Sequence, residues 1–222
     1  MKKYVTLALL ALCLGVVPAS AFADTLTLVS TGGQTVNGVQ IYPYNFSVNG
    51  ASTLTALLCL NYNREVSVGE TWNVTKSSIA LDNSQTSINY RALAIIDYDI
   101  STGHGGYSAS DLQFADWSIF APSDMAHNSG YTSTAASIVQ NALQLASNDA
   151  YTHSGFYSAF TIYTPTSNQT GWTNGIPPEF MGYTAPTTSP VPEPSTLMML
   201  GTGLIGAAGA MRRKFSGATL RR

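Results

Sequence analysis

Two residues of the sequence have side chains that could react with each other, the thiol of Cys59 and the amide of Gln113. A thiolate can attack the side-chain amide of a glutamine, expel ammonia and leave an internal thioester. Such a bond is an electrophile, so it must stay dry until an amine or a hydroxyl group reaches it. Trp117 follows Gln113 by one helical turn, and we expect its side chain to cover the bond and exclude water.

The cysteine content draws attention to Cys59. The chain has two cysteines, and Cys13 lies in an N-terminal apolar run that we expect to be removed on export. An exported protein with a single thiol cannot form an internal disulfide bond. The alternative is that Cys59 is a small apolar core residue in the run 57–60, and that Gln113 caps a nearby backbone group.

The sequences around both residues resemble those of bacterial surface thioester domains, which carry a cysteine on an early strand and a later Gln-x-Ala-x-Trp helix. The first element is LCL at 58–60, and the second is QFADW at 113–117. The resemblance implies that Cys59 is the thiol partner, Gln113 the acyl donor and Trp117 the shield. It also implies that the target is an amine on another surface molecule. Asp116 departs from the pattern, because its place is usually apolar.

The N-terminus has the three parts of a secretory signal peptide. Lys2 and Lys3 precede an uncharged apolar run at 4–17, and an Ala-x-Ala site ends at Ala23. The apolar run is shorter than the roughly 20 residues that a membrane span needs. We therefore expect residues 1–23 to be cleaved, which leaves Asp24 as the first residue.

The C-terminus predicts a membrane anchor. A Pro-rich linker at 184–194 leads into an uncharged apolar run at 195–211, which spans roughly 25 Å as a helix. The basic residues Arg212, Arg213 and Lys214 follow at once. Because basic flanks stay in the cytoplasm, we interpret 195–211 as a single transmembrane helix, with a cytoplasmic tail at 212–222 and the rest of the chain outside.

The triplet Pro192-Glu193-Pro194, together with the short Gly-rich apolar helix and its basic stop, resembles the PEP-CTERM sorting signal. The resemblance implies processing by an exosortase, a membrane cysteine peptidase of Gram-negative bacteria that make extracellular polysaccharide. It specifies a destination and no activity. The precursor would be anchored in the inner membrane with its ectodomain outside, and the mature protein would reach the cell surface or the extracellular matrix.

The charge distribution argues against nucleic-acid binding. The chain has 10 Lys and Arg and 12 Asp and Glu, but seven of the basic residues lie at the two ends. Three basic and eleven acidic residues remain between Asp24 and Glu179, a net charge of −8. Phosphate contacts require clustered Lys and Arg on the folded part.

Residues 24–183 are long enough for one domain with its own core. Alternating apolar residues predict the early strands, and Asn49-Gly50 predicts a hairpin turn. Apolar residues at helical spacing predict a central helical block, in which Ser110 caps the second helix and Pro122 stops it. We expect strands at 25–29, 42–48, 53–62, 71–75 and 156–163, and helices at 87–98, 110–120 and 132–147. This order predicts an α+β fold, with a sandwich-like or barrel-like sheet and an inserted helical block.

Other candidate sites are weaker, and we expect neither a metal nor a cofactor. The spacing at 97–103 resembles a calcium loop, but a solvated acidic turn fits it better, because the glycine and the closing glutamate are missing. The remaining candidates are carboxylates for glycoside cleavage, histidines without ligand spacing, and aromatic residues that could stack on sugars. These are Asp111, Asp116 and Asp124; His104, His127 and His153; and Tyr42, Tyr44, Trp172 and Tyr183.

These features predict an exported protein with a structural or adhesive role in the cell envelope or its polysaccharide matrix, acting through a thioester between Cys59 and Gln113. The alternative is a carbohydrate-binding module of that matrix without covalent chemistry. We expect no enzymatic activity, since an enzyme acting on polysaccharide ranks behind both. The expected partners are exosortase, the membrane, and surface amines or extracellular polysaccharide.

Overall fold

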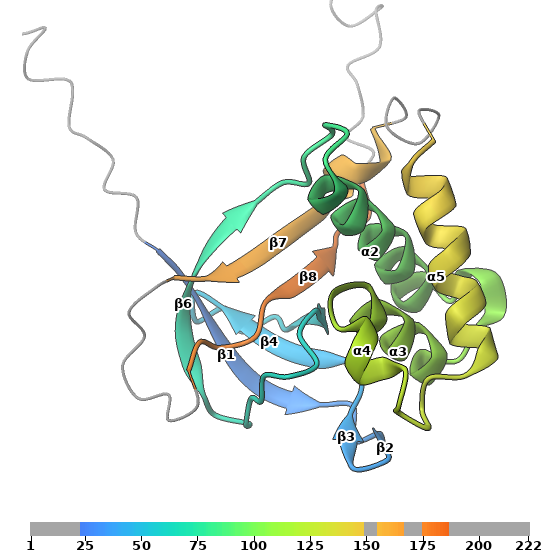
Figure 1. The fold of residues 1–222 in the computed structure, drawn as a ribbon. Coiled ribbons are helices and arrows are strands. Elements are labelled where there is room, and N and C mark those ends of the chain that lie inside the picture. Colours follow the sequence, from blue (N-terminus) through green and yellow to red (C-terminus); the bar gives the residue numbers. More distant parts are fainter. Residues whose placement is uncertain (1–22, 149–154, 167–174, 187–222) are drawn as a thin grey trace, which may run out of the picture. The chain divides into compact units, whose positions relative to one another are not determined.

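The computed structural model describes residues 23–148, 155–166 and 175–186 (Figure 1). The predicted signal peptide, the PEP triplet, the apolar run at 195–211 and the basic tail therefore lie outside the described residues, apart from Ala23. No helix within the described ranges is long and apolar enough to cross a membrane. The strands and helices that follow belong to one unit, which extends to Thr184.

Six antiparallel strands close into a barrel in the order β1-β4-β5-β8-β7-β6, which confirms the barrel-like alternative for the sheet (Figure 1). The strands are β1 (Asp24–Thr31), β4 (Tyr44–Val48), β5 (Thr55–Cys59), β6 (Thr71–Ser77), β7 (Phe160–Pro165) and β8 (Phe180–Tyr183). A separate two-stranded hairpin, β2 (Thr35–Val36) and β3 (Val39–Gln40), was not predicted.

The predicted hairpin turn joins β4 to β5. Asn49 and Gly50 both have a positive φ, 54° and 73°. Two consecutive residues of this kind make the turn whose twist matches that of the flanking strands. The turn sets the register in which Tyr44 pairs with Leu57, and it thereby determines which face of β5 each residue occupies.

A helical block lies between β6 and β7 in the sequence and packs beside the barrel, as predicted (Figure 1). It contains α2 (Gln85–Thr102), η1 (His104–Gly106), α3 (Ala109–Phe120), α4 (Pro122–Met125) and α5 (Ser133–Ala146). Helix α2 contacts β8, and α3 contacts β5. The two parts of the fold therefore meet at the strand that carries Cys59.

Strand β5 separates two hydrophobic cores. Leu57 and Cys59 belong to the cluster inside the barrel, with Phe46 and Phe180. Leu58 belongs to the larger cluster between the barrel and the helices. This alternation follows from the two-residue period of a strand.

The structure corrects three boundaries. Helix α2 begins earlier than predicted, because the Ser84 side chain caps it, and it continues through 101–102 to Gly103, whose φ of 71° ends it. Ser110 lies inside α3, and the cap is Ser108, whose side chain accepts from the backbone N–H of Asp111. The expected strand at 156–163 begins as a 3-10 helix, η2 (Phe156–Ala159), and only then becomes β7.

The corrected cap can be tested by two neighbouring substitutions. We expect Ser108→Ala to lower the free energy of unfolding by about 0.5–2 kcal/mol, because it leaves a backbone N–H of the first turn without a partner. Ser110→Ala is the control and should change it much less, since Ser110 already lies within the helix. Urea unfolding of the exported protein measures both, and equal losses would contradict the assignment of the cap.

Candidate functional site

Cys59 is the last residue of β5 and is only 3% exposed. It pairs with Phe180 of β8, and its Sγ donates to the backbone oxygen of Asn61 at 3.6 Å. Burial raises the pKa of the thiol to about 12, although the contact with Asn61 opposes the rise. Cys59 is thus a protonated thiol at neutral pH, held by two neighbouring strands.

Gln113 lies on α3 and is fully buried. Its Nε2 donates to the backbone oxygen of Cys59 at 2.9 Å and to Oδ2 of Asp116 at 3.3 Å. Its Oε1 has no hydrogen-bond partner within the described part of the chain. The fold thus brings together two residues that are 54 positions apart. The contact is a backbone cap, as the alternative interpretation expected, and it also places the amide at the residue that carries the thiol.

Trp117 lies one turn after Gln113 and is 2% exposed. Its ring packs edge-on against Phe114 and is tilted against Tyr62, with centroid distances of 5.4 Å in both cases. Among the described residues the indole N–H has no hydrogen-bond partner, yet it is near enough to Cys59 to lower the pKa of the thiol against the effect of burial. Trp117 therefore lies close to Cys59 and one helical turn from Gln113, and its predicted shielding role stays a prediction.

Two aspartates are fully buried near this pair. Asp97 accepts from Ser101 Oγ at 3.0 Å, and burial raises its pKa to about 8. Burial also raises the pKa of Asp116 well above its usual range, and the nearby Asp97 adds to this effect. One oxygen of each carboxyl group, Asp97 Oδ2 and Asp116 Oδ1, has no hydrogen-bond partner in the described ranges. Burial therefore favours the protonated form of both groups.

Neither interpretation of the acidic segment at 97–103 is correct. Asp97, Asp99 and Ser101 lie on helix α2, and Gly103 is its C-cap, so these residues form neither a calcium loop nor a solvated turn. The helical period of the neighbouring apolar residues could have indicated this. Within the described residues, no cluster of three or more His, Cys, Asp or Glu side chains could hold a metal ion.

A cavity of about 510 Å³ reaches Cys59 and Trp117 from the surface. Its walls come from the unpredicted β2–β3 hairpin and from residues 61–67, and they include Gln40, Tyr62 and Glu65. Tyr44, considered from sequence for stacking on sugars, is 5% exposed and lines this cavity. The sequence gives no periodic signal for such a cavity, because loops form most of it.

The other predicted carboxylates do not form a pair. Asp111 accepts from the hydroxyls of Ser108 and Thr132, and Asp124 accepts from the amide of Asn63. Asp116 is buried beside Gln113 and away from solvent. The three aspartates therefore have separate structural environments.

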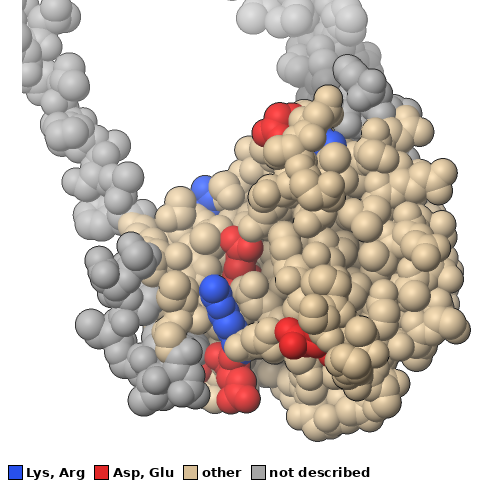
Figure 2. All heavy atoms as spheres, in the orientation of Figure 1, with Lys and Arg blue, Asp and Glu red and all other residues tan. Residues whose placement is uncertain are grey.

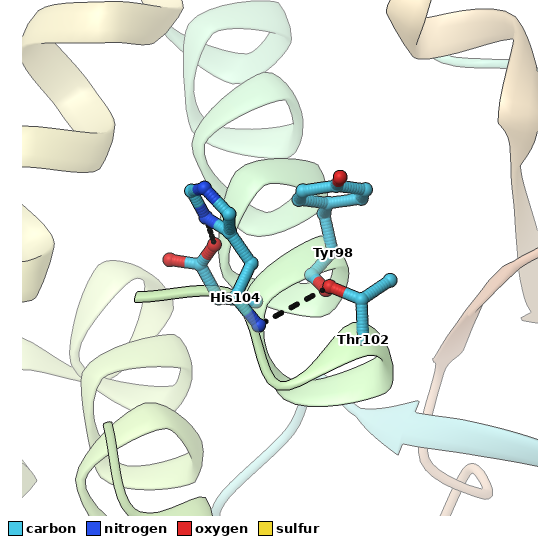
Figure 3. A network of polar contacts seen from close by, with 4 residues as sticks. Tyr98, Thr102 and His104 are labelled. Carbon is cyan, nitrogen blue, oxygen red and sulfur yellow. Dashed lines mark hydrogen bonds and ion pairs between the residues drawn. The ribbon is translucent and has the colours of Figure 1, made fainter. Parts of the chain in front are cut away.

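The histidines and the remaining aromatic residues do not gather into a site. His104 binds Asp99 at 2.9 Å, and its backbone N–H contacts Thr102 beside the Tyr98 ring (Figure 3). His127 is exposed, and Tyr42 and Tyr183 are half-buried. His153 and Trp172 lie outside the described residues.

The buried Asp97 should make stability depend on pH. Its pKa is 3.8 when exposed and about 8 in the folded protein, so the folded state binds the extra proton between these values. The contribution of Asp97 to the free energy of unfolding therefore decreases as pH rises, by roughly 1.4 kcal/mol per pH unit. We expect Asp97→Asn to remove this slope. Ser101→Ala should extend it to higher pH, because the hydroxyl favours the charged form. Urea unfolding between pH 5 and 8 measures both, and identical slopes in all three proteins would contradict the assignment.

Comparison with known proteins bears on the C-terminus. No curated protein and no solved structure matches the chain significantly, so the resemblance to thioester domains stays a prediction. Residues 190–214 match the PEP-CTERM protein-sorting motif, which confirms the sorting signal predicted around Glu193. The motif supports export, a membrane-anchored precursor and processing by exosortase at the membrane.

Proposed function

We propose that the exported domain has a structural or adhesive role and attaches covalently to a surface molecule through a thioester between Cys59 and Gln113. The observation that carries the proposal is the 2.9 Å hydrogen bond from Gln113 Nε2 to the backbone oxygen of Cys59. A buried glutamine whose Oε1 has no hydrogen-bond partner lowers the stability of the fold. Gln113 lies next to Cys59, the one cysteine among the described residues, and a reaction between the two would account for this cost.

The proposed bond forms by an exchange that balances without an oxidant. Sγ of Cys59 attacks the amide carbon Cδ of Gln113, the Cδ–Nε2 bond breaks, and ammonia leaves with the proton that the thiol gives up. Because the thiol is protonated at neutral pH, the step depends on proximity rather than on a free thiolate. The β5–α3 contact supplies that proximity.

The second step would be attack by an amine. Its nitrogen forms an amide with Cδ of Gln113, the Cδ–Sγ bond breaks, and the thiol of Cys59 is restored. The cavity that reaches Cys59 gives the amine a route, and Glu65 on its wall would attract an ammonium group. The acidic charge of the region between the chain ends acts in the same direction.

The cavity also favours one second candidate, non-covalent binding of extracellular polysaccharide. Tyr62, Asn61 and Asn63 line the cavity and combine an aromatic face with amide groups, a chemistry that suits sugar rings and hydroxyls. The face in Figure 2 carries few charged side chains. The cavity itself has one of each sign in its wall, Arg64 and Glu65. This candidate requires no reaction of Cys59.

The intact mass of the exported protein, purified from cells that express the full chain, separates the two candidates. We expect a species lighter by one ammonia, which methylamine converts to a species heavier by one CH2 than the unreacted protein. Cys59→Ser and Gln113→Ala should each have the full mass expected from their sequence, and methylamine should leave them unchanged.

A wild-type protein of full mass with one titratable thiol would contradict the thioester. Binding to a glycan array that survives Cys59→Ser and is lost in Tyr62→Ala would then favour the carbohydrate-binding candidate. Tyr62 is a suitable probe, because it lines the cavity and is only half-buried.

Processing gives a separate test of the sorting signal. In cells without exosortase, the precursor should keep the C-terminal segment 195–222, since no peptidase acts near the triplet Pro192-Glu193-Pro194. A chain with Glu193→Ala is the matched variant and should accumulate in the same uncut form. Mass spectrometry of C-terminal peptides measures this, and Arg212 in the mature surface form would contradict it.

A further inference from the structure

The carboxyl group of Asp116 lies against the nitrogen that would leave during thioester formation. Gln113 Nε2 donates to its Oδ2 at 3.3 Å, and the residue is fully buried, so the proton of the acid form would move to Nε2 only once the amide nitrogen becomes basic on attack by the thiol. Gln113 and Asp116 are three positions apart on α3, so their side chains lie on the same side of the helix. No basic side chain forms an ion pair with Asp116 in the described part of the chain.

The titratable groups around Asp116 come from three other elements. Asp97 on α2, Cys59 on β5 and Tyr44 on β4 all interact with it electrostatically, and Arg64 acts on the same thiol. None of these contacts neutralises a carboxylate at Asp116. Burial therefore favours the uncharged acid form of Asp116, which lies 3.3 Å from an amide nitrogen that requires a proton before it can leave.

We propose that Asp116 is a catalytic residue that protonates Nε2 of Gln113 as the thioester forms. This inference rests on the proposed function. Sγ of Cys59 bonds to Cδ, the Cδ–Nε2 bond breaks, and the carboxyl proton of Asp116 goes to the departing nitrogen. The proton that the thiol loses restores the carboxyl group, so one ammonia is released and Asp116 is unchanged.

The same group would serve the reaction with an amine. In that direction the carboxylate form of Asp116 accepts a proton from the attacking nitrogen and passes it to the sulfur of Cys59, which leaves as a thiol. By microscopic reversibility, the acid of the forward step is the base of the reverse step. Opening by methylamine therefore reports on the residue that forms the bond.

A purely structural role for Asp116 explains the geometry less well. The carboxyl group leaves its Oδ1 without a partner in a site that is otherwise shielded by apolar and aromatic side chains. A buried carboxyl group in such a place costs free energy that an apolar side chain would not. A role of this acid in the reaction would explain why a buried carboxyl group is kept here despite its cost in stability.

The test compares two substitutions of buried aspartates in the exported protein. Asp116→Asn keeps the shape but removes the acid. Asp97→Asn is the matched control, because Asp97 is equally buried but its hydrogen bond is to Ser101, whereas Asp116 accepts from Gln113. We expect Asp116→Asn to slow opening of the thioester by methylamine about 100-fold, or to leave most of the chains at full mass. Asp97→Asn should form the bond and open within a few-fold of the wild-type rate.

A measurement on the wild-type protein requires no variant to fold. The opening rate, divided by the concentration of uncharged methylamine, should rise with pH as Asp116 loses its proton and then level off. A rate that does not change with pH would overturn the role of Asp116.

The outcomes separate the two proposals. A wild-type protein that never loses ammonia overturns both the thioester and the role of Asp116. The role of Asp116 alone is overturned if the wild-type protein forms the bond and a folded Asp116→Asn protein forms and opens it at the same rate. A folded Asp116→Asn protein at full mass beside a reacted Asp97→Asn protein supports both.

Discussion

One hydrogen bond joins the two halves of this fold at the candidate site, from the amide of Gln113 on α3 to the backbone oxygen of Cys59 at the end of β5. The barrel fixes Cys59 because β5 pairs with β4 and β8, with Cys59 itself opposite Phe180, and the packing of α3 in the helical block fixes Gln113. Neither part alone positions both groups. Any change that moves α3 against β5 would therefore separate the thiol from the amide.

Burial gives the site its chemical character. Removal from water raises the pKa of the Cys59 thiol and of the Asp97 and Asp116 carboxyl groups, which favours their protonated forms. It also leaves donors and acceptors unsatisfied, which costs stability. A cluster of neutral reactive groups beside a cavity suits a reaction that must wait for a partner, and it is a poor arrangement for stability alone.

Local patterns predicted those parts of the structure that depend on local rules. The Asn49-Gly50 turn, the helix at 133–146 and the placement of Gln113 and Trp117 one turn apart follow from turn chemistry and helical spacing. Ser108 was missed as the cap because Gly105, Gly106 and Ser110 lie close to it, and each is a residue type that can occupy a helix N-cap. Asp97 was misinterpreted because the identity of a residue does not reveal its burial, and the β2–β3 hairpin was too short for a periodic signal.

The central claim concerns one covalent bond, and a crystal structure of the exported protein tests it most directly. The account predicts continuous density between Sγ of Cys59 and Cδ of Gln113, with Nε2 absent and Trp117 covering the bond. A separate thiol beside an intact amide, with Nε2 still donating to the backbone oxygen of Cys59, would contradict it.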